Sequence, residues 1–191
     1  MDEHLSWNHH ITHLCKNLVK YFGIFKKLRE SITKKLARQL YYAFIYSRID
    51  YGIQIYGSCS ATMLTRIQTL SNKLLKFLLK LNPRTPTNRL HTDLKILKVN
   101  DIFEVNLLTF VRKCLYKECP SLFNDYFTYQ QHNYNVRNPK LHVPRSRINL
   151  ATNSVRIKGA VLWNALDSSV KSKANLKCFK GILKKHYIGR Y

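Results

Sequence analysis

Carboxylates are scarce in this sequence, and only two pairs of them stand out as candidates for chemistry. Asp2 and Glu3 are adjacent near the N-terminus, and Asp101 and Glu104 lie where a helix is expected to begin. Two-metal phosphoryl transfer requires carboxylates that converge on magnesium ions. Placement of acids at a helix N-terminus accounts for the second pair without catalysis. We therefore expect no catalytic residue in this chain.

Histidines and cysteines form only weak candidates for a metal site. His9 and His13 lie four residues apart, a spacing at which two imidazoles can bind one zinc ion from a helix. No glutamate lies between them as in zinc proteases, and Cys15 projects from a different side. Cys114 and Cys119 lack the second pair that a zinc ribbon needs, so we interpret them as buried thiols. With no glycine-rich phosphate loop, nucleophile elbow or dinucleotide fingerprint present, we expect neither metal nor cofactor.

Positive charge is the dominant property of the chain. Its 191 residues include 33 Lys and Arg against 10 Asp and Glu, a formal net charge of +23. Self-repulsion on this scale destabilises a compact fold, which favours a polyanionic partner. Nucleic acid is the first candidate, an anionic membrane surface the second, and a merely solubilising surface the third.

Cysteine usage and hydropathy restrict the compartment. Five cysteines at irregular spacing argue against a disulfide framework and for a reducing environment. We find no signal-peptide pattern and no apolar run of the roughly 18 residues that a membrane span needs. Apolar stripes recur in several segments, which favours packing of helices against one another over a membrane surface. We expect a cytoplasmic or nuclear protein with no membrane partner.

Apolar residues recur at helical spacing over most of the chain and predict a mainly α fold. Ser6, Thr33 and Asn100 are suitable N-caps, and a kink or break is expected over residues 47–52. The predicted helices cover residues 6–29, 33–47, 61–80, 101–118 and 175–187. The second of them has an apolar stripe with members four residues apart: Leu36, Leu40 and Phe44.

The C-terminal half is less regular. Residues 83–99 contain two prolines and predict a connector with a short helix. Residues 128–153 lack apolar periodicity and predict an extended basic loop, in which residues 141–143 could form a short strand. Trp163 lies among apolar neighbours and is expected in the core rather than in a base-stacking site.

The charge is concentrated at the two ends of the chain. Residues 1–82 carry +9, residues 83–130 carry +2 and residues 131–191 carry +12. We expect the first and last parts to contact a polyanion and the middle part to serve as packing scaffold.

Five short segments match one known family in order along the chain. The first is Met-Asp-Glu-His-Leu-Ser-Trp-Asn-His-His-Ile at residues 1–11. Next are residues 40–57, which end in Tyr56-Gly57, and residues 66–73, with Arg-Ile-Gln and Asn-Lys. Tyr-Asn-Val-Arg at 134–137 and Lys-Gly-Ala-Val-Leu-Trp-Asn-Ala-Leu at 158–166 complete the set. This order resembles the part of non-LTR retrotransposon (LINE, jockey-like) reverse transcriptases that follows the polymerase palm.

The resemblance implies a thumb-like helical domain at residues 1–82, which grips the template–primer duplex, and a helical C-terminal region at 83–191. Tyr56 and Val136 depart from the tryptophan and threonine that are usual in the family. The family's catalytic aspartates belong to the palm, and no Asp-Asp pair occurs in this sequence. We expect a non-catalytic, nucleic-acid-binding fragment, from a truncated reading frame or an internal methionine. The alternatives are complementation of a palm in trans, and an interaction protein or degenerate relic without present activity.

This interpretation predicts sequence-independent phosphate contacts from the basic helices. Its partner would be RNA, an RNA–DNA hybrid or DNA, and the surface that would face a palm could cause self-association. The expected contacts in residues 1–82 are Lys16, Lys20, Lys26, Lys27, Lys34, Lys35, Arg38, Lys73 and Lys76. Those in residues 83–191 are Tyr134, Arg137, Arg145, Arg147, Lys184 and Lys185, although a solvated loop would explain the first four equally well.

Overall fold

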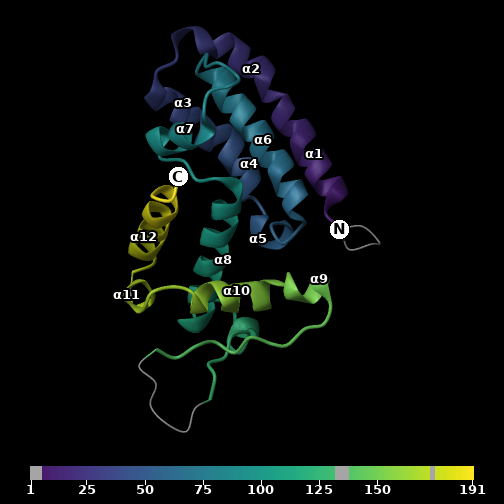
Figure 1. The fold of residues 1–191 in the computed structure, drawn as a ribbon, viewed down its shortest axis with the longest axis vertical. Coiled ribbons are helices and arrows are strands. Elements are labelled where there is room, and N and C mark those ends of the chain that lie inside the picture. Colours follow the sequence, from purple (N-terminus) through teal and green to yellow (C-terminus); the bar gives the residue numbers. More distant parts are fainter. Residues whose placement is uncertain (1–5, 132–137, 173–174) are drawn as a thin grey trace. The chain divides into compact units, whose positions relative to one another are not determined.

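Helices dominate the computed structural model, which describes residues 6–131, 138–172 and 175–191 (Figure 1). Over these described residues, β pairing is limited to an isolated antiparallel bridge between Tyr129 and Leu141. The mainly α fold expected from the sequence is confirmed. The chain packs as two compact units, Met1–Phe103 with Tyr187–Tyr191, and Glu104–His186. The division expected from the family resemblance, after residue 82, differs from this packing boundary.

The first unit contains most of the helices. They are α1 (Asn8–Val19), α2 (Tyr21–Leu28), α3 (Lys34–Leu40), α4 (Ser47–Asp50), α5 (Ile53–Tyr56), α6 (Ala61–Leu78) and α7 (Thr87–Leu94). A 3-10 turn (Arg29–Ser31) follows α2, and a π-helical segment (Tyr41–Tyr46) joins α3 to α4. The unit also includes the start of α8 (Val99–Leu115).

The second unit begins within α8 and continues through a 3-10 turn (Ser121–Phe123), α9 (Asn149–Thr152), α10 (Val155–Asn164), α11 (Ser168–Lys171) and most of α12 (Leu176–Ile188). The short strand considered for residues 141–143 is absent, and only Leu141 makes a bridge. A helical turn, α9, occupies the end of the predicted loop.

The first predicted helix is present as α1 and α2, which are separated by a turn at Lys20. Its buried side chains are Ile11, Leu14, Leu18 and Phe25. Ser6 is not the N-cap, because the helix begins one residue later with Trp7 in that position. The Ser6 hydroxyl still accepts a hydrogen bond from the Asn8 N–H at 3.4 Å.

The second predicted helix is capped as expected but buries a different stripe. The Thr33 hydroxyl accepts from the Leu36 N–H at 3.2 Å. Leu36 is 41% exposed, so the predicted stripe is wrong by one position. The fully buried residues are Ala37, Tyr41, Ile45 and Ile49. A step of four residues overshoots an α-helical turn by about 40°, and the wider π turn in the middle rotates this face back toward the core.

The helix ends at Asp50, within the predicted break. Gly52 then adopts a left-handed conformation with φ 70°, which glycine reaches without a steric penalty. The chain turns into α5, where the Tyr56 hydroxyl donates to the Ile49 carbonyl. His10 of α1 packs on the Tyr56 ring at 4.9 Å, so this turn is fixed to the start of the bundle.

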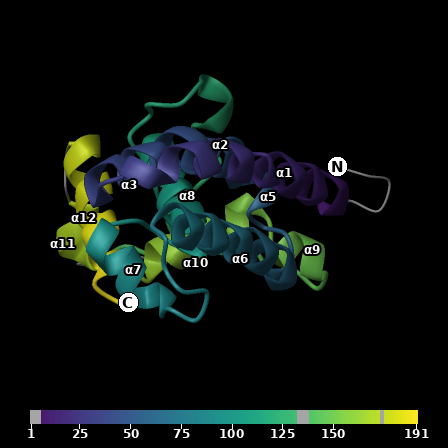
Figure 2. The same cartoon turned by 90° about the horizontal axis from the view of Figure 1, so that it is seen from above.

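Three helical stretches pack side by side in the first unit. Figure 2 shows α1 and α2 running along α6, and the Phe22 and Phe77 rings meet edge-on at 5.2 Å. The stretch from α3 to α4 runs in the direction opposite to α1 and α2. The ring centroids of Phe44 and Tyr21 lie 5.3 Å apart. This bundle presents the outer sides of α1, α2 and α6 to solvent.

A polar network joins α6 to α7 and α8. Gln68 accepts the Val99 N–H at 2.7 Å and donates to Asn72 at 2.8 Å. His91 is fully buried, with Nδ1 donating to the Ile96 carbonyl at 3.1 Å and Nε2 3.3 Å from the Gln68 amide nitrogen. The network ties residues beyond the α6 end to the bundle, which explains why the first unit extends past residue 82.

The N-terminus of α8 differs from the prediction in its first residue. The helix begins at Val99, so Asn100 lies inside it and is not the cap. Side chains remote in sequence take the capping role: Gln68 binds the Val99 N–H, and the Tyr191 hydroxyl accepts from the Lys98 N–H at 2.9 Å. Sequence reasoning missed this cap because both partners come from outside the local segment.

The second unit is organised around α10 and α12. Trp163 is 3% exposed and its ring lies 6.0 Å from Phe179, which confirms the predicted core position. A Cβ on Gly159 would lie 2.9 Å from a methyl of Val111, so only glycine permits this close approach. The Asn164 side chain accepts the Leu141 N–H at 2.7 Å and donates to its carbonyl at 2.9 Å.

Gly57 provides a steric test of the first unit. A Cβ at this position would lie 2.3 Å from Cδ2 of Phe103 and 2.4 Å from the Ile53 carbonyl oxygen. We expect Gly57→Ala to lower the free energy of unfolding by about 1–3 kcal/mol, because a backbone atom blocks relaxation. Urea denaturation followed by circular dichroism measures the change. The matched control is Gly23→Ala in exposed α2, where no atom lies within 4 Å and alanine should stabilise the helix.

His91 predicts a pH dependence of stability. Burial lowers the pKa of His91, the nearby Lys98 lowers it further, and the Ile96 carbonyl opposes both. The neutral ring is therefore favoured in the folded state, while the unfolded chain takes up a proton below the ordinary value of 6.5. We expect the free energy of unfolding to fall as pH drops below that value.

His91→Gln should reduce this acid sensitivity, even if the variant is less stable at neutral pH. The measurement is urea unfolding at about pH 7.5 and about pH 5.5 for the wild type and each variant. The exposed His9→Gln is the control, and its pH slope should match that of the wild type. An unchanged slope in the His91 variant would contradict the assignment.

Candidate nucleic-acid interface

The outward face of α1 and α2 carries a row of exposed lysines. Lys16, Lys20 and Lys27 lie on the side opposite the buried Leu14 and Leu18, and all three are exposed. Their spacing of four and seven residues keeps them on one face of the helical stretch. Residues 6–29 contain no acidic residue, so this face has no carboxylate of its own.

A second group of cations flanks the contact between α2 and α6. Lys26 lies four residues after Phe22, and Lys73 lies four residues before Phe77, whose rings touch at 5.2 Å. Both lysines are exposed. At helical spacing, each lysine lies on the same side of its helix as the neighbouring phenylalanine. The α2–α6 contact is thus apolar at its centre and cationic along its edges.

The Lys76 ammonium makes a contact within the protein. Lys76 is half-buried, and its ammonium donates to the Pro83 carbonyl at 2.6 Å. The lysine therefore fixes the connector that follows α6.

The expected contacts on α3 are exposed but do not all share one environment. Arg38 stacks over the Tyr42 ring at 5.3 Å from its centroid, and Lys35 is exposed. Lys34 lies at a cavity of about 470 Å³, together with Arg89 and Asp93. Lys34 and Lys35 begin α3, and no acidic residue lies in its first turn, so positive charge lies at the helix end that the macrodipole disfavours.

Glu30 is the one acidic residue in the described salt bridges of the first unit. It binds Lys80 at 2.9 Å and lies 3.9 Å from Arg29. The hydrogen bond and charge of Lys80 lower the pKa of the Glu30 carboxyl. None of the described salt bridges involves Lys16, Lys20 or Lys27, and the Lys20 ammonium donates to the neutral Asn17 side chain at 3.2 Å, so no described carboxylate neutralises these three cations.

The structure adds basic residues that the predicted set omitted. Arg29 lies over the Phe77 ring at 4.7 Å, beside the α2–α6 contact. Arg48 donates to the Tyr21 hydroxyl at 3.2 Å. Lys80 continues the spacing of Lys73 and Lys76, and this repeat is the signal that marks it in the sequence. No local pattern marks the two arginines.

The second unit has its own cations. Arg145 and Arg147 are exposed on the loop before α9, and on α12 Lys185 is exposed while Lys184 is half-buried. Tyr134 and Arg137 lie outside the described residues. The loop is anchored near Leu141, where the Asn164 amide bonds to both backbone groups.

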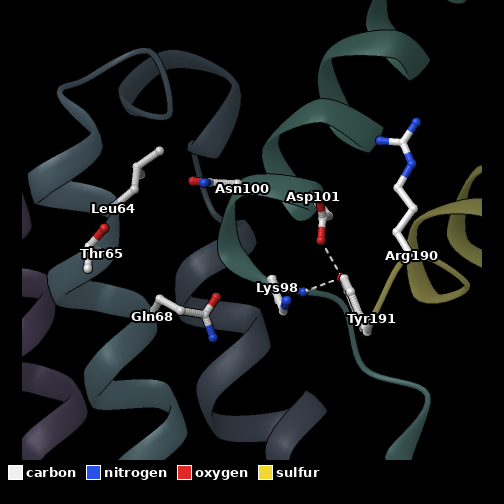
Figure 3. A pocket seen from close by; sticks show the side chains of 8 residues that line it. All are labelled: Leu64, Thr65, Gln68, Lys98, Asn100, Asp101, Arg190 and Tyr191. Carbon is white, nitrogen blue, oxygen red and sulfur yellow. Dashed lines mark hydrogen bonds between the residues drawn. The ribbon is translucent and has the colours of Figure 1, made fainter. Parts of the chain in front are cut away.

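A polar pocket lies beside the N-terminus of α8 (Figure 3). It measures about 300 Å³ and is lined in part by Gln68 and Arg190. The Tyr191 hydroxyl donates to the Asp101 carboxylate, and the Lys98 ammonium lies 4.2 Å from the Tyr191 ring centroid. Burial and the Asp101 hydrogen bond raise the pKa of Tyr191. These side chains bind one another, which favours a structural role for the pocket lining.

The residues considered for catalysis and metal binding are placed only in part. Asp101 and Glu104 lie three residues apart on α8, and Asp2 and Glu3 lie outside the described residues. Across the described part of the chain, no three His, Cys, Asp or Glu side chains gather closely enough to hold a metal ion.

Cys114 and Cys119 are free thiols whose sulfurs lie 3.7 Å apart. Cys114 is 2% exposed, as expected for a core thiol, whereas Cys119 is half-buried. Burial, together with the Cys119 sulfur, raises the pKa of Cys114 to about 12. A thiol with so high a pKa is a poor nucleophile at neutral pH.

Within the described residues, no helix combines the length and apolar character needed to cross a bilayer. Comparison with protein-family models, with curated proteins and with solved structures gave no match to this chain.

Proposed function

We propose that this chain binds nucleic acid through the phosphate backbone, with the lysine row of α1 and α2 as the principal contact. The observation that carries the proposal is the common exposed face of Lys16, Lys20 and Lys27 on a helical stretch without acidic residues. A row of lysines offers point charges to phosphates without reading bases. Binding is therefore expected to depend strongly on salt and weakly on sequence.

The dimensions of the row suit a nucleic-acid backbone. At about 1.5 Å per residue, Lys16 and Lys27 are separated by about 16 Å along the helix axis. A strand of duplex DNA presents one phosphate per about 3.4 Å of its axis, so this span covers about five phosphates. The cations beside the α2–α6 contact, Lys26 and Lys73, extend the charged surface around the bundle.

The family resemblance gives this binding a biological setting. In the proposal, the chain acts as the thumb and C-terminal part of a non-LTR retrotransposon reverse transcriptase and grips RNA, an RNA–DNA hybrid or DNA. The family's catalytic aspartates belong to the palm, so these residues are proposed to bind nucleic acid without catalysing polymerisation. The cytoplasm or nucleus is the expected compartment.

Exposed apolar side chains on the same helices support self-association. Val19 is 51% exposed and Ile24 is 42% exposed.

Reversing the charge of the three lysines in the row tests the proposal. We expect the combined variant Lys16→Glu, Lys20→Glu, Lys27→Glu to weaken binding at least about tenfold, equivalent to about 1.4 kcal/mol. The slope of log affinity on log salt should fall in magnitude by about 2 to 3, since each lost duplex contact removes about 0.9. Fluorescence anisotropy with a labelled RNA–DNA hybrid and with single-stranded RNA, across a salt series, measures both quantities.

A charge-matched control separates the effect of the lysine row on binding from the effect of the net charge. Arg84, Lys95 and Lys177 are exposed and lie outside the predicted contacts, so their combined change to Glu alters the charge equally. We expect this control to weaken binding much less than the row variant. Equal losses would show that overall charge, and not the α1–α2 face, carries the binding. No binding by the wild type would favour an interaction protein or a relic.

A further inference from the structure

Two cysteines lie in contact at the C-terminal end of α8, in the second unit. Cys114 belongs to the last turn of the helix, and Cys119 lies just beyond its end. Both are free thiols, and Cys114 donates a weak hydrogen bond to the Cys119 sulfur, with the two sulfurs 3.7 Å apart. A disulfide bond is about 2 Å long, so an approach of less than about 2 Å would join them.

Backbone hydrogen bonds fix the turn between the two cysteines. The Glu118 N–H donates to the Lys113 carbonyl at 2.8 Å. The Lys117 N–H donates to the Cys114 carbonyl at 3.1 Å, and Lys117 adopts a left-handed conformation with φ 56°. These features together form a Schellman motif, a common way for a helix to end. The motif folds the chain back over the last turn of α8, which brings Cys119 beside Cys114.

An ion pair restrains the same turn. Arg112 is fully buried, and its guanidinium donates to both carboxylate oxygens of Glu118, at 3.3 and 3.5 Å. Glu118 immediately precedes Cys119, so the residue beside the second thiol is held by its side chain as well as by its backbone. A fixed turn therefore sets the distance between the two sulfurs.

The two thiols differ in their access to solvent. Cys114 is 2% exposed, whereas Cys119 is half-buried. An oxidant that arrives from solvent therefore reaches Cys119 first, with Cys114 behind it in the core. Burial raises the pKa of Cys114, and so does the neighbouring Cys119 thiol. Oxidation of Cys119 to a neutral species removes the second of these causes, which makes the Cys114 thiolate easier to form.

We propose that Cys114 and Cys119 are a site of reversible oxidation, at which hydrogen peroxide converts the two thiols into a disulfide within the chain. First, the Cys119 sulfur attacks one peroxide oxygen, the O–O bond breaks, Cys119 becomes a sulfenic acid and one water leaves. The Cys114 thiolate then attacks the Cys119 sulfur, and the S–S bond forms as the S–O bond breaks. The sulfenic hydroxyl leaves with the Cys114 proton as a second water.

The electrons balance, because the two thiols lose two electrons and one peroxide molecule gains them. A thiol such as glutathione reduces the disulfide again, so in a reducing compartment the bond is transient. The site contains no residue of the lysine row, and its test does not depend on the proposed function.

Mass spectrometry of the full-length wild type tests the disulfide. The reduced protein is treated with hydrogen peroxide, remaining thiols are alkylated with N-ethylmaleimide, and the chain is digested with chymotrypsin. Cleavage after Tyr116 separates the two cysteines, so the disulfide appears as a covalent link between two peptides. We expect this link in most molecules that run as monomers on a non-reducing gel, and its loss after dithiothreitol.

The exposed Cys178 is the control for general oxidation and should be absent from linked peptides. Failure to find the link between Cys114 and Cys119 would overturn the inference. Linkage only between separate copies of the chain would overturn it too.

Single variants test the order of the two steps. In Cys114→Ala the sulfenic acid at Cys119 has no partner thiol, so dimedone, which traps sulfenic acids, should label Cys119 at least about fivefold more than in the wild type. In Cys119→Ala the remaining Cys114 is buried and should be labelled much less. Stronger labelling of Cys114 than of Cys119 would overturn the proposed steps.

A matched pair of variants tests the turn. Lys117→Gly and Lys117→Val remove the same charge, but glycine adopts the left-handed conformation freely, whereas β-branched valine does not. We expect Lys117→Gly to form the disulfide within about twofold of the wild-type rate and Lys117→Val to be at least about threefold slower. Circular dichroism before oxidation checks that both variants have the helix content of the wild type. Equal rates in the two variants would contradict the inference that the turn sets the approach of the sulfurs.

Discussion

The side chain of Gln68 holds the first unit together, because it satisfies polar groups on three helices at once. It caps the first N–H of α8 at 2.7 Å, binds Asn72 within α6 at 2.8 Å and lies 3.3 Å from the buried His91 of α7. Without it, the Val99 N–H would lose its partner in a part-buried setting, and an unsatisfied donor there costs more than a single hydrogen bond contributes. The bundle helices that display the lysines depend on this anchoring of α6, since α6 packs against both α1 and α2.

Helix content was predictable because apolar spacing and caps are local properties of the sequence. The periodic stripe of α1 and the cap at Thr33 follow from residue types alone. The buried face of the next stretch was not predictable in register, because the π-helical segment changes the rotation per residue within it. The cap of α8 escaped prediction for a different reason: its hydrogen-bond partners, Gln68 and Tyr191, lie far away in sequence.

The distinction between local sequence patterns and partners remote in sequence also applies to the candidate site. Exposure of Lys16, Lys20 and Lys27 follows directly from the position of the buried stripe, since a helix that buries one face must show the other. The role of Lys76 depends on where the connector places the Pro83 carbonyl, which no periodicity encodes. The position of the loop near Leu141 likewise depends on the bridge to Tyr129 and on Asn164 of α10.

The chemistry of the proposed contact bears on what the chain would bind. Lysines on one helical face suit the regular phosphates of a nucleic-acid backbone and read no bases. The charge distribution is consistent with contacts at both ends of the chain, since residues 1–82 carry +9 and residues 131–191 carry +12, while the stretch between them is nearly neutral at +2.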